Sequence, residues 1–194
     1  MSPSPRLSLR AASLDATHAI AAALAGLSRA GDVILLAGEM GAGKTAFAQG
    51  FGRALGVTEP ITSPTFTLVH SYDTAGPTLH HADVYRLDQL AEVADLALGE
   101  LAEFDGIVLV EWGDVAGSAF GDHLEVRLNH VDDLDGDDHD DDDHDETAGD
   151  EHEEAVSDDE FADDGSREIE LRAVGTSWAG RWDRITRGVE RFRC

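Results

Sequence analysis

Lysine is almost absent from this sequence. Of the 14 Lys+Arg residues only one, Lys44, is a lysine, so arginine supplies the positive charge everywhere else. A position that keeps lysine against this bias needs a compact charge on a flexible stem, which a planar guanidinium cannot provide. Lys44 is therefore the first candidate functional residue.

Cysteine and long apolar runs are scarce as well. The one cysteine, Cys194, can form no disulfide within the chain, which fits a reducing compartment. No apolar run approaches the roughly 20 residues that a membrane span needs. Residues 19–27 loosely resemble the core of a signal peptide, but their helical spacing favours an amphipathic helix. We expect a cytoplasmic protein without a membrane partner.

The shortage of positive charge is concentrated in one part of the chain. The formal net charge is −26 over 194 residues, and residues 132–164 hold 20 of the 40 Asp+Glu and no Lys or Arg. The other 20 acids against 14 basic residues leave −6, as in an ordinary globular domain. Because this balance does not attract nucleic acid, any role on RNA would pass through a partner protein.

The spacing of apolar residues predicts an α/β domain. Strands 66–72 and 79–85 should form an antiparallel hairpin through a Gly/Pro turn, and strands 33–37 and 106–112 should be buried. The expected elements are helices at 13–30, 45–55, 89–98 and 178–190, with further strands at 123–131 and 167–174.

The acidic stretch has too little apolar surface to fold alone. Alternating strands flank it, so we interpret 132–165 as a disordered insertion in an edge hairpin, with 1–131 and 166–194 forming one domain. A long loop is tolerated because its closure entropy grows only with the logarithm of its length. A docking or metal-buffering segment that uses His139, His144 and His152 is the alternative.

The segment GEMGAGKT (38–45) matches G-x-x-x-x-G-K-[ST], with an apolar strand before it and an amphipathic helix after it. Such glycines let the main chain bend around phosphate, and its N–H groups with the helix N-terminus bind anionic oxygens. Lys44 would reach between the β- and γ-phosphates, and Thr45 would place a hydroxyl on Mg²⁺. The alternative is a glycine-rich turn without a ligand.

A second candidate stretch is HHADVYRL (80–87). In an extended strand His81, Asp83 and Tyr85 share one face, where they could position Mg²⁺ or an attacking water. A solvated edge strand is the alternative interpretation, and a His-x-Asp transition-metal site is a third.

Two further stretches carry polar residues at the ends of apolar ones. GIVLVEW (106–112) ends in Glu111, where P-loop enzymes keep an acid that contacts Mg²⁺ directly or through water. SPTFTLV (63–69) offers Ser63 or Thr65 as a sensor of the γ-phosphate, as in switch loops.

In this order and spacing the four stretches resemble the bacterial TsaE (YjeE) family of small P-loop ATPases. That family serves the threonylcarbamoyladenosine modification of tRNA at the adenosine next to the anticodon. The resemblance covers about residues 13–130 and resumes at Arg167. It implies a single P-loop NTPase-type α/β domain, whose mixed central sheet has an antiparallel portion and is flanked by helices. It also implies slow hydrolysis of ATP with Mg²⁺, stimulated by the TsaB–TsaD pair, with tRNA reached only through that complex.

The resemblance also implies roles for single residues. Asp83 and Lys44 are the expected catalytic residues, and Thr45 and Glu111 the expected Mg²⁺ ligands. The nucleotide would be held by the loop and two outlying side chains: Glu39, Met40, Gly41, Ala42, Gly43, Lys44, Thr45, Thr17 and Trp112. The loop reads GEM where the family commonly has GDL, and the acidic insertion is not a usual feature of the family. Because the insertion lies between edge strands, we expect it to be dispensable for ATP turnover.

Two other functions fit the same loop. A small-molecule or nucleoside kinase would need several arginines on a closing lid, and between Lys44 and residue 126 only Arg53 and Arg86 are available. A nucleotide-binding regulatory protein would hydrolyse ATP only incidentally.

Overall fold

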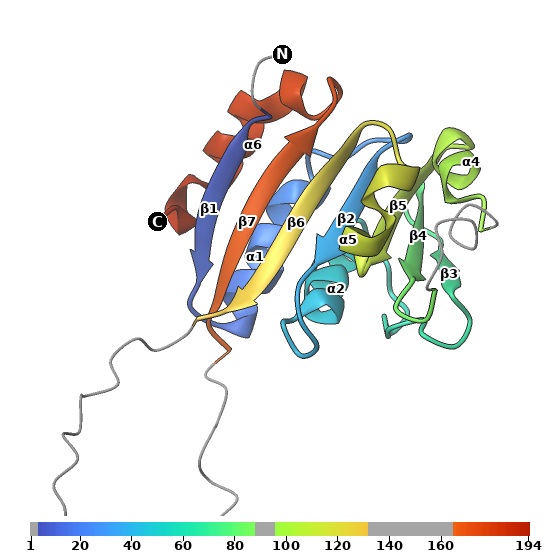
Figure 1. Cartoon of the computed structure of the whole chain (residues 1–194), viewed down its shortest axis with the longest axis horizontal. Helices are drawn as coiled ribbons and strands as arrows, with labels where there is room; N and C mark the ends of the chain where they lie inside the picture. The colour runs from blue at the N-terminus through green and yellow to red at the C-terminus, as the bar shows by residue number, and fades with distance from the viewer. Residues whose placement is uncertain (1–3, 88–95, 132–164) are drawn as a thin grey trace, which may run out of the picture.

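The computed structural model describes residues 4–87, 96–131 and 165–194, whose strands form one seven-stranded sheet in the order β1-β7-β6-β2-β5-β4-β3 (Figure 1). The strands are β1 (Arg6–Ala11), β2 (Val33–Ala37), β3 (Val69–Tyr72), β4 (Thr78–Asp83), β5 (Gly106–Glu111), β6 (His123–His130) and β7 (Arg167–Val174). Strands β4, β5, β2 and β6 are parallel, whereas β3 pairs antiparallel with β4, and β7 with both β6 and β1. The predicted fold class, a mixed sheet with an antiparallel portion, is confirmed.

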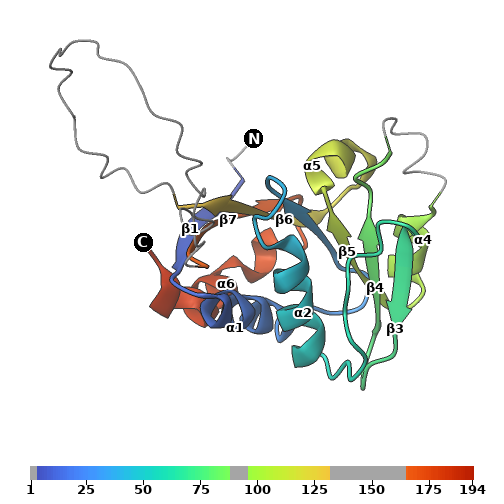
Figure 2. The ribbon, with the colours of Figure 1, turned by 90° about the horizontal axis from the view of Figure 1, so that it is seen from below.

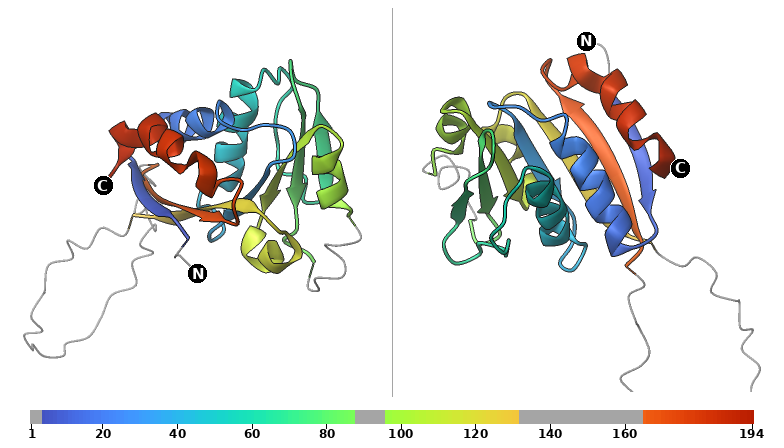
Figure 3. Two further views of the ribbon diagram at one scale, coloured as in Figure 1. Left: turned by 90° about the horizontal axis from the view of Figure 1, so that it is seen from above. Right: turned by 180° about the vertical axis from the view of Figure 1, so that it is seen from behind.

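Helices cover the sheet unequally. The helices are α1 (Leu14–Ala25), α2 (Lys44–Ala54), α4 (Leu98–Glu103), α5 (Gly113–Ala116) and α6 (Trp182–Val189), with 3-10 turns at Gly117–Ala119, Ala179–Arg181 and Glu190–Phe192. Figures 2 and 3 show α1, α2 and α6 together on one face, while the short α4 and α5 lie on the other side, over β5 and its neighbours. No described helix is long and apolar enough to cross a bilayer.

Strand β2 is apolar throughout because it supplies both faces of the sheet. Ile34 and Leu36 pack in the core under α1 and α2, and Val33 and Leu35 pack in the core on the opposite face. A central parallel strand covered on both sides has no solvent face, which removes the usual alternation. The end of β2 is thus fixed from both sides, and the glycine-rich loop follows it directly.

The helix after that loop is held close to α1. A Cβ at Gly50 of α2 would collide with the main chain of His18 in α1, so only glycine permits this approach. Helix α1 begins as predicted, with the Ser13 side chain accepting from the N–H of Ala16 at 3.2 Å. It ends at Ala25, earlier than the expected residue 30.

The remaining differences from the sequence prediction concern strand positions. The hairpins β3–β4 and β6–β7 are confirmed. β7 is not an edge strand, because the unpredicted strand β1 pairs along its outer side. Nor is β4 a solvated edge, since it lies between β3 and β5 with Leu79–Asp83 buried. The predicted helix at 89–98 and the acidic insertion fall largely outside the described residues.

Candidate functional site

The loop between β2 and α2 adopts a conformation that its glycines make possible. Gly38 has φ 133°, and a Cβ there would collide with the main-chain oxygen of Leu128 on β6. Gly43 has φ 98° and occupies the N-cap of α2 without a side-chain cap. The free N–H groups of the first turn of α2 therefore remain available for an anion.

Lys44 turns back into this loop. Its Nζ donates to the main-chain oxygens of Gly38 at 2.8 Å and Glu39 at 2.7 Å, and the residue is only 5% exposed. The same ammonium lies 3.6 Å from the ring centroid of Trp112, within cation–π range. The compact head predicted from the lysine bias is thus enclosed on two sides, by main chain and by an aromatic ring.

Carboxylates surround this ammonium at longer range. Burial lowers the pKa of Lys44, while the charges of Glu111, Asp114 and Asp83 oppose that decrease. A cation whose charge is penalised by lost hydration gains when an anionic ligand arrives. The site is therefore poised for negatively charged oxygens.

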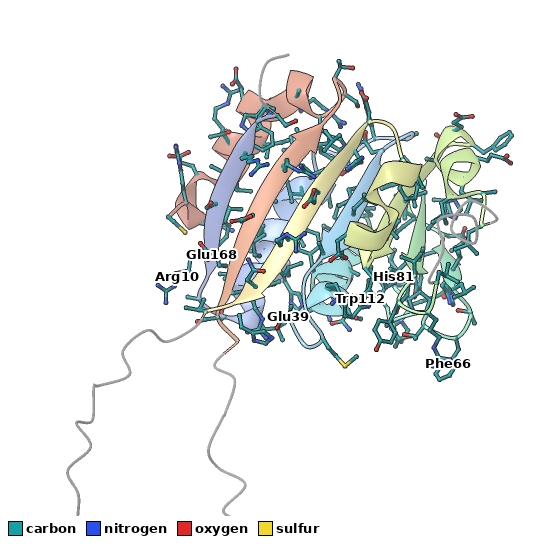
Figure 4. All side chains as sticks on the ribbon, in the orientation of Figure 1. Arg10, Glu39, Phe66, His81, Trp112 and Glu168 are labelled. Atoms are coloured by element: carbon teal, nitrogen blue, oxygen red, sulfur yellow. The ribbon has the colours of Figure 1, made fainter. Side chains whose placement is uncertain are left out.

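Trp112 is held in an unusual conformation beside Lys44. Its φ is 63°, in the left-handed region that bulky residues avoid at a cost of about 1–3 kcal/mol. Its ring also contacts Tyr85, with centroids 4.8 Å apart. Figure 4 shows Trp112 at the same end of the sheet as Glu39 of the loop.

The end of β5 supplies a carboxylate to the first turn of α2. Thr45 Oγ1 donates to Glu111 Oε1 at 2.9 Å, and Oε2 lies 3.2 Å away. His81 Nε2 lies 2.9 Å from the same Oε1, and His81 is fully buried. A hydroxyl and a carboxylate side by side are the oxygen donors that Mg²⁺ prefers.

Asp83 ends the neighbouring strand β4 and organises the loop before β3. Its Oδ2 accepts from Ser63 Oγ at 2.5 Å and from Thr65 Oγ1 at 2.7 Å, and its Oδ1 accepts from the N–H of Tyr85 at 2.9 Å. Asp83 is 2% exposed. Tyr85 lies beyond the end of β4, so the expected shared face reaches only from His81 to Asp83.

These side chains line one hollow of about 390 Å³ at the carboxyl ends of the parallel strands. Open α/β sheets bind ligands in such a place. The residues around it come from the loop, the Ser63–Thr65 segment, and the ends of β4 and β5: Met40, Gly41, Gly43, Lys44, Thr45, Ala46, Ser63, Thr65, Asp83, Tyr85, Glu111 and Trp112. Lys44, Thr45, Asp83, Glu111 and Trp112 are thus brought together.

Other residues that were predicted to hold the nucleotide lie farther from this hollow or offer it only their main chain. Glu39 and Met40 are exposed on the loop, so only their main chain can serve an anion, whereas Ala42 is buried. Glu39 and Trp112 also border a second hollow of about 390 Å³. Thr17 is buried in α1 and lines neither hollow, so its place near a nucleotide stays a prediction.

The proposed transition-metal alternative lacks support in the described part of the chain. It contains no group of three or more His, Cys, Asp or Glu side chains arranged to hold a metal. His81 and Asp83 bind different partners, Glu111 and the Ser63–Thr65 segment. The histidines of the acidic insertion lie outside the described residues.

Sequence reasoning missed Arg167, which opens β7 and contacts the glycine-rich loop. Its Nε donates to the main-chain oxygen of Ala42 at 3.0 Å. The strand REIELRAV (167–174) could have indicated this contact, because Arg167 stands in phase with the inward-facing Ile169 and Leu171 and is therefore expected to be buried.

A buried parallel strand, a glycine-rich loop and a helix that starts with Lys-Thr define an α/β protein of the P-loop NTPase type. The family model described as "Threonylcarbamoyl adenosine biosynthesis protein TsaE" matches residues 11–137, and the chain belongs to this family. The predicted resemblance is therefore confirmed.

Individual relatives agree with that membership. The chain is similar to the tRNA threonylcarbamoyladenosine biosynthesis protein TsaE of Bacillus subtilis (42% identical over 107 residues, 55% of this chain and 66% of that protein). It is also similar to those of Streptomyces coelicolor (43% over 112 residues, 56% and 75%) and Mycobacterium tuberculosis (44% over 116 residues, 55% and 68%). The matched segment thus spans about two thirds to three quarters of these proteins. Among solved structures, the crystal structure of Bacillus subtilis YdiB matches with a TM-score of 0.64 and 27% identity, over 98% of both chains.

Proposed function

We propose that this protein is a Mg²⁺-dependent ATPase that supports a TsaB–TsaD type pair in the threonylcarbamoyladenosine modification of tRNA. The names of its relatives support a role in tRNA threonylcarbamoyladenosine biosynthesis, and we place the modification at the adenosine next to the anticodon. The site supports the ATPase activity. Because the chain is acidic, tRNA is reached through the partner proteins.

One observation carries the proposal: Lys44, Thr45, Asp83 and Glu111 line the same hollow although they come from α2, β4 and β5. The residues present fit a magnesium nucleotide. Lys44 neutralises negative charge, the loop leaves main-chain N–H groups free, and Thr45 and Glu111 supply oxygen donors 2.9 Å apart.

Each residue then has a defined task. The loop and the N-terminus of α2 bind the phosphate oxygens, and Lys44 offsets the charge that develops as the terminal phosphate leaves. Thr45 and Glu111 would hold Mg²⁺, which offsets phosphate charge and orients its oxygens when bound. His81 fixes the orientation of the Glu111 carboxylate through the contact with Oε1 at 2.9 Å.

Asp83 links hydrolysis to the segment that carries Ser63 and Thr65. Because its Oδ2 accepts from both hydroxyls, Asp83 fixes their positions at the edge of the hollow. Hydroxyls held there would contact a water or the terminal phosphate oxygens. Switch loops change position between states. If a partner protein must reposition the segment that carries Ser63 and Thr65 in the same way, the protein alone hydrolyses ATP slowly.

A kinase with the same loop is disfavoured by where its arginines lie. Arg53 lines a separate hollow at the far end of α2, and Arg86 stacks 4.6 Å from the ring centroid of Phe66. Neither lines the hollow that holds Lys44. A closing lid rich in arginine is therefore missing from the described residues near this site.

The test combines binding with turnover. Calorimetry of wild-type protein with Mg²⁺ and ATP should show uptake, and phosphate release should rise sharply only when TsaB and TsaD are added. A pull-down with TsaB and TsaD should depend on which nucleotide is present. Phosphorylation of a small acceptor would establish the kinase instead, and absence of nucleotide binding would refute both.

A further inference from the structure

Arg167 is a charged residue at a position where the strand pattern calls for an apolar one. In β7 the alternate residues Ile169, Leu171 and Ala173 face the core, and Arg167 is in phase with them and 6% exposed. Burying an arginine is costly unless its donors are bonded. Its contacts therefore show why an arginine stands there.

Those contacts are with the glycine-rich loop. Nε donates to the oxygen of Ala42 at 3.0 Å, Nη2 to that of Gly41 at 3.2 Å, and Nη1 to that of Ser166 at 2.6 Å. A planar guanidinium can serve neighbouring acceptors in this way, because its donors form a rigid fork. The loop is thus bonded to a strand 125 residues away in sequence.

Two cations divide the carbonyl groups of the loop between them. Lys44 takes the oxygens of Gly38 and Glu39, and Arg167 takes those of Gly41 and Ala42. In a planar trans peptide the C=O and the following N–H point in opposite directions. Turning the Ala42 carbonyl toward Arg167 therefore turns the N–H of Gly43 away from it.

This division matters for an anionic ligand. Carbonyl oxygens carry partial negative charge and would repel phosphate if they pointed into the loop. Bonding to a permanent cation fixes their direction and offsets that charge. Apart from the N–H of Ala42, which donates to the oxygen of Glu39, the N–H groups that follow these carbonyls can then meet the ligand without reorganisation when it arrives, which is the condition for strong electrostatic binding.

We propose that Arg167 is a positioning residue that holds the glycine-rich loop in its anion-binding conformation before any nucleotide arrives. The inference rests on the nucleotide binding proposed above. It makes the first residue of β7 part of the phosphate site although it follows the acidic insertion in sequence. Arg167 acts through the main chain of Gly41 and Ala42.

The test uses three variants of the full chain. Arg167→Met removes the charge and the fork, and Arg167→Lys keeps the charge without the fork. Arg172→Met is the matched control, because Arg172 lies on the same strand but pairs with Glu125 on the opposite face. Circular dichroism and thermal melting establish that each variant folds.

Two measurements decide the outcome. Amide hydrogen exchange of nucleotide-free protein should be about 10-fold faster at Ala42 in Arg167→Met, because the N–H of Ala42 donates to the oxygen of Glu39 at 3.2 Å and this bond opens more often once Arg167 no longer fixes the loop. The Kd for Mg²⁺–ATP should rise about 10- to 100-fold, as expected when bonds from a charged group are lost. Arg167→Lys should fall between this variant and wild type, and Arg172→Met should match wild type in both measurements.

Several results would overturn the inference. An amide exchange rate in Arg167→Met equal to that of wild type would mean that the loop keeps its conformation without Arg167. An exchange rate and a Kd in Arg167→Lys equal to those of wild type would mean that the charge alone suffices. If Arg167→Met fails to fold, Arg167→Lys decides by the same criterion. If wild-type protein binds no nucleotide, the proposed function fails, and the exchange comparison still decides whether Arg167 positions the loop.

Discussion

Replacing Lys44 by arginine tests whether the site needs a compact charge or only a positive one. Lys44 Nζ is enclosed by two carbonyl oxygens at 2.7 and 2.8 Å and by the Trp112 ring, 3.6 Å from its centroid. A guanidinium is larger and planar, so it cannot occupy this space unless Trp112 or the loop moves. Such a movement would also disturb the contact of Trp112 with Tyr85, whose ring centroid lies 4.8 Å away.

Two effects set the expected magnitude. Forcing a larger group into a packed site costs about 1–3 kcal/mol, which corresponds to about 5- to 150-fold in binding or turnover. Removing the cation altogether, in Lys44→Ala, should cost about 3–4 kcal/mol of transition-state stabilisation, or about 10²- to 10³-fold. Overpacking in Lys44→Arg is thus damaging although the formal charge is conserved, and only at the upper end of its range does it approach the effect of losing the charge.

The assay is phosphate release with TsaB and TsaD present, together with calorimetry of Mg²⁺–ATP binding. Arg184→Lys is the control, since Arg184 is exposed on α6 and the same exchange of cations should change nothing there. Turnover by Lys44→Arg within about twofold of wild type would refute the steric reasoning. It would then mean that only the charge is required, and the lysine would remain unexplained.

Three further perturbations probe other groups. Glu111→Gln should raise the Mg²⁺ concentration needed to promote ATP binding about 10- to 100-fold, measured by calorimetry over a range of Mg²⁺. Binding of ATP without Mg²⁺ should be retained. Asp83→Ala should keep Mg²⁺–ATP binding and lose about 10²-fold in hydrolysis, because Ser63 and Thr65 lose the acceptor that fixes them; equal loss of both would show that Asp83 has another role. Burial lowers the pKa of His80 from 6.5, so the folded state favours the neutral imidazole over the charged one. That stability is present above pH 6.5 and is lost as the pH falls through the lowered value, so thermal melting should show acid destabilisation that His80→Gln reduces.

Local patterns were sufficient to predict the centre of this fold. The run VILLA, the glycines after it and the Phe47–Phe51 spacing in α2 predict strand, loop and helix within about two residues. Glu111 could be singled out because an acid at the end of an apolar strand has few packing roles. These features depend on neighbours in sequence, and sequence periodicity reports on such neighbours directly.

Contacts between segments that are distant in sequence could not be predicted from sequence periodicity. Strand β1 alternates clearly, with Leu7, Leu9 and Ala11 buried, but its pairing with β7 depends on a partner about 160 residues further along. The role of Arg167 likewise exists only after β7 returns to the loop. For Asp83 the strand pattern predicted a face shared with His81, but the bonds to Ser63 and Thr65 follow from how the preceding segment folds back.

The attachment points of the acidic insertion have a consequence for ionic strength. Strand β6 ends and strand β7 begins beside the glycine-rich loop. His130 lies close to Gly41 there, and Arg167 binds the main-chain oxygen of Ala42. The insertion that carries the 20 carboxylates of 132–164 therefore joins the described part of the chain next to a site proposed for another polyanion, and its expected dispensability for ATP turnover stays a prediction. Their long-range repulsion is screened by salt, whereas the short contacts of Lys44 are screened much less. Titrations at rising sodium chloride should thus show ATP binding more tightly, the reverse of ordinary phosphate sites, and removal of residues 136–160 should flatten that dependence.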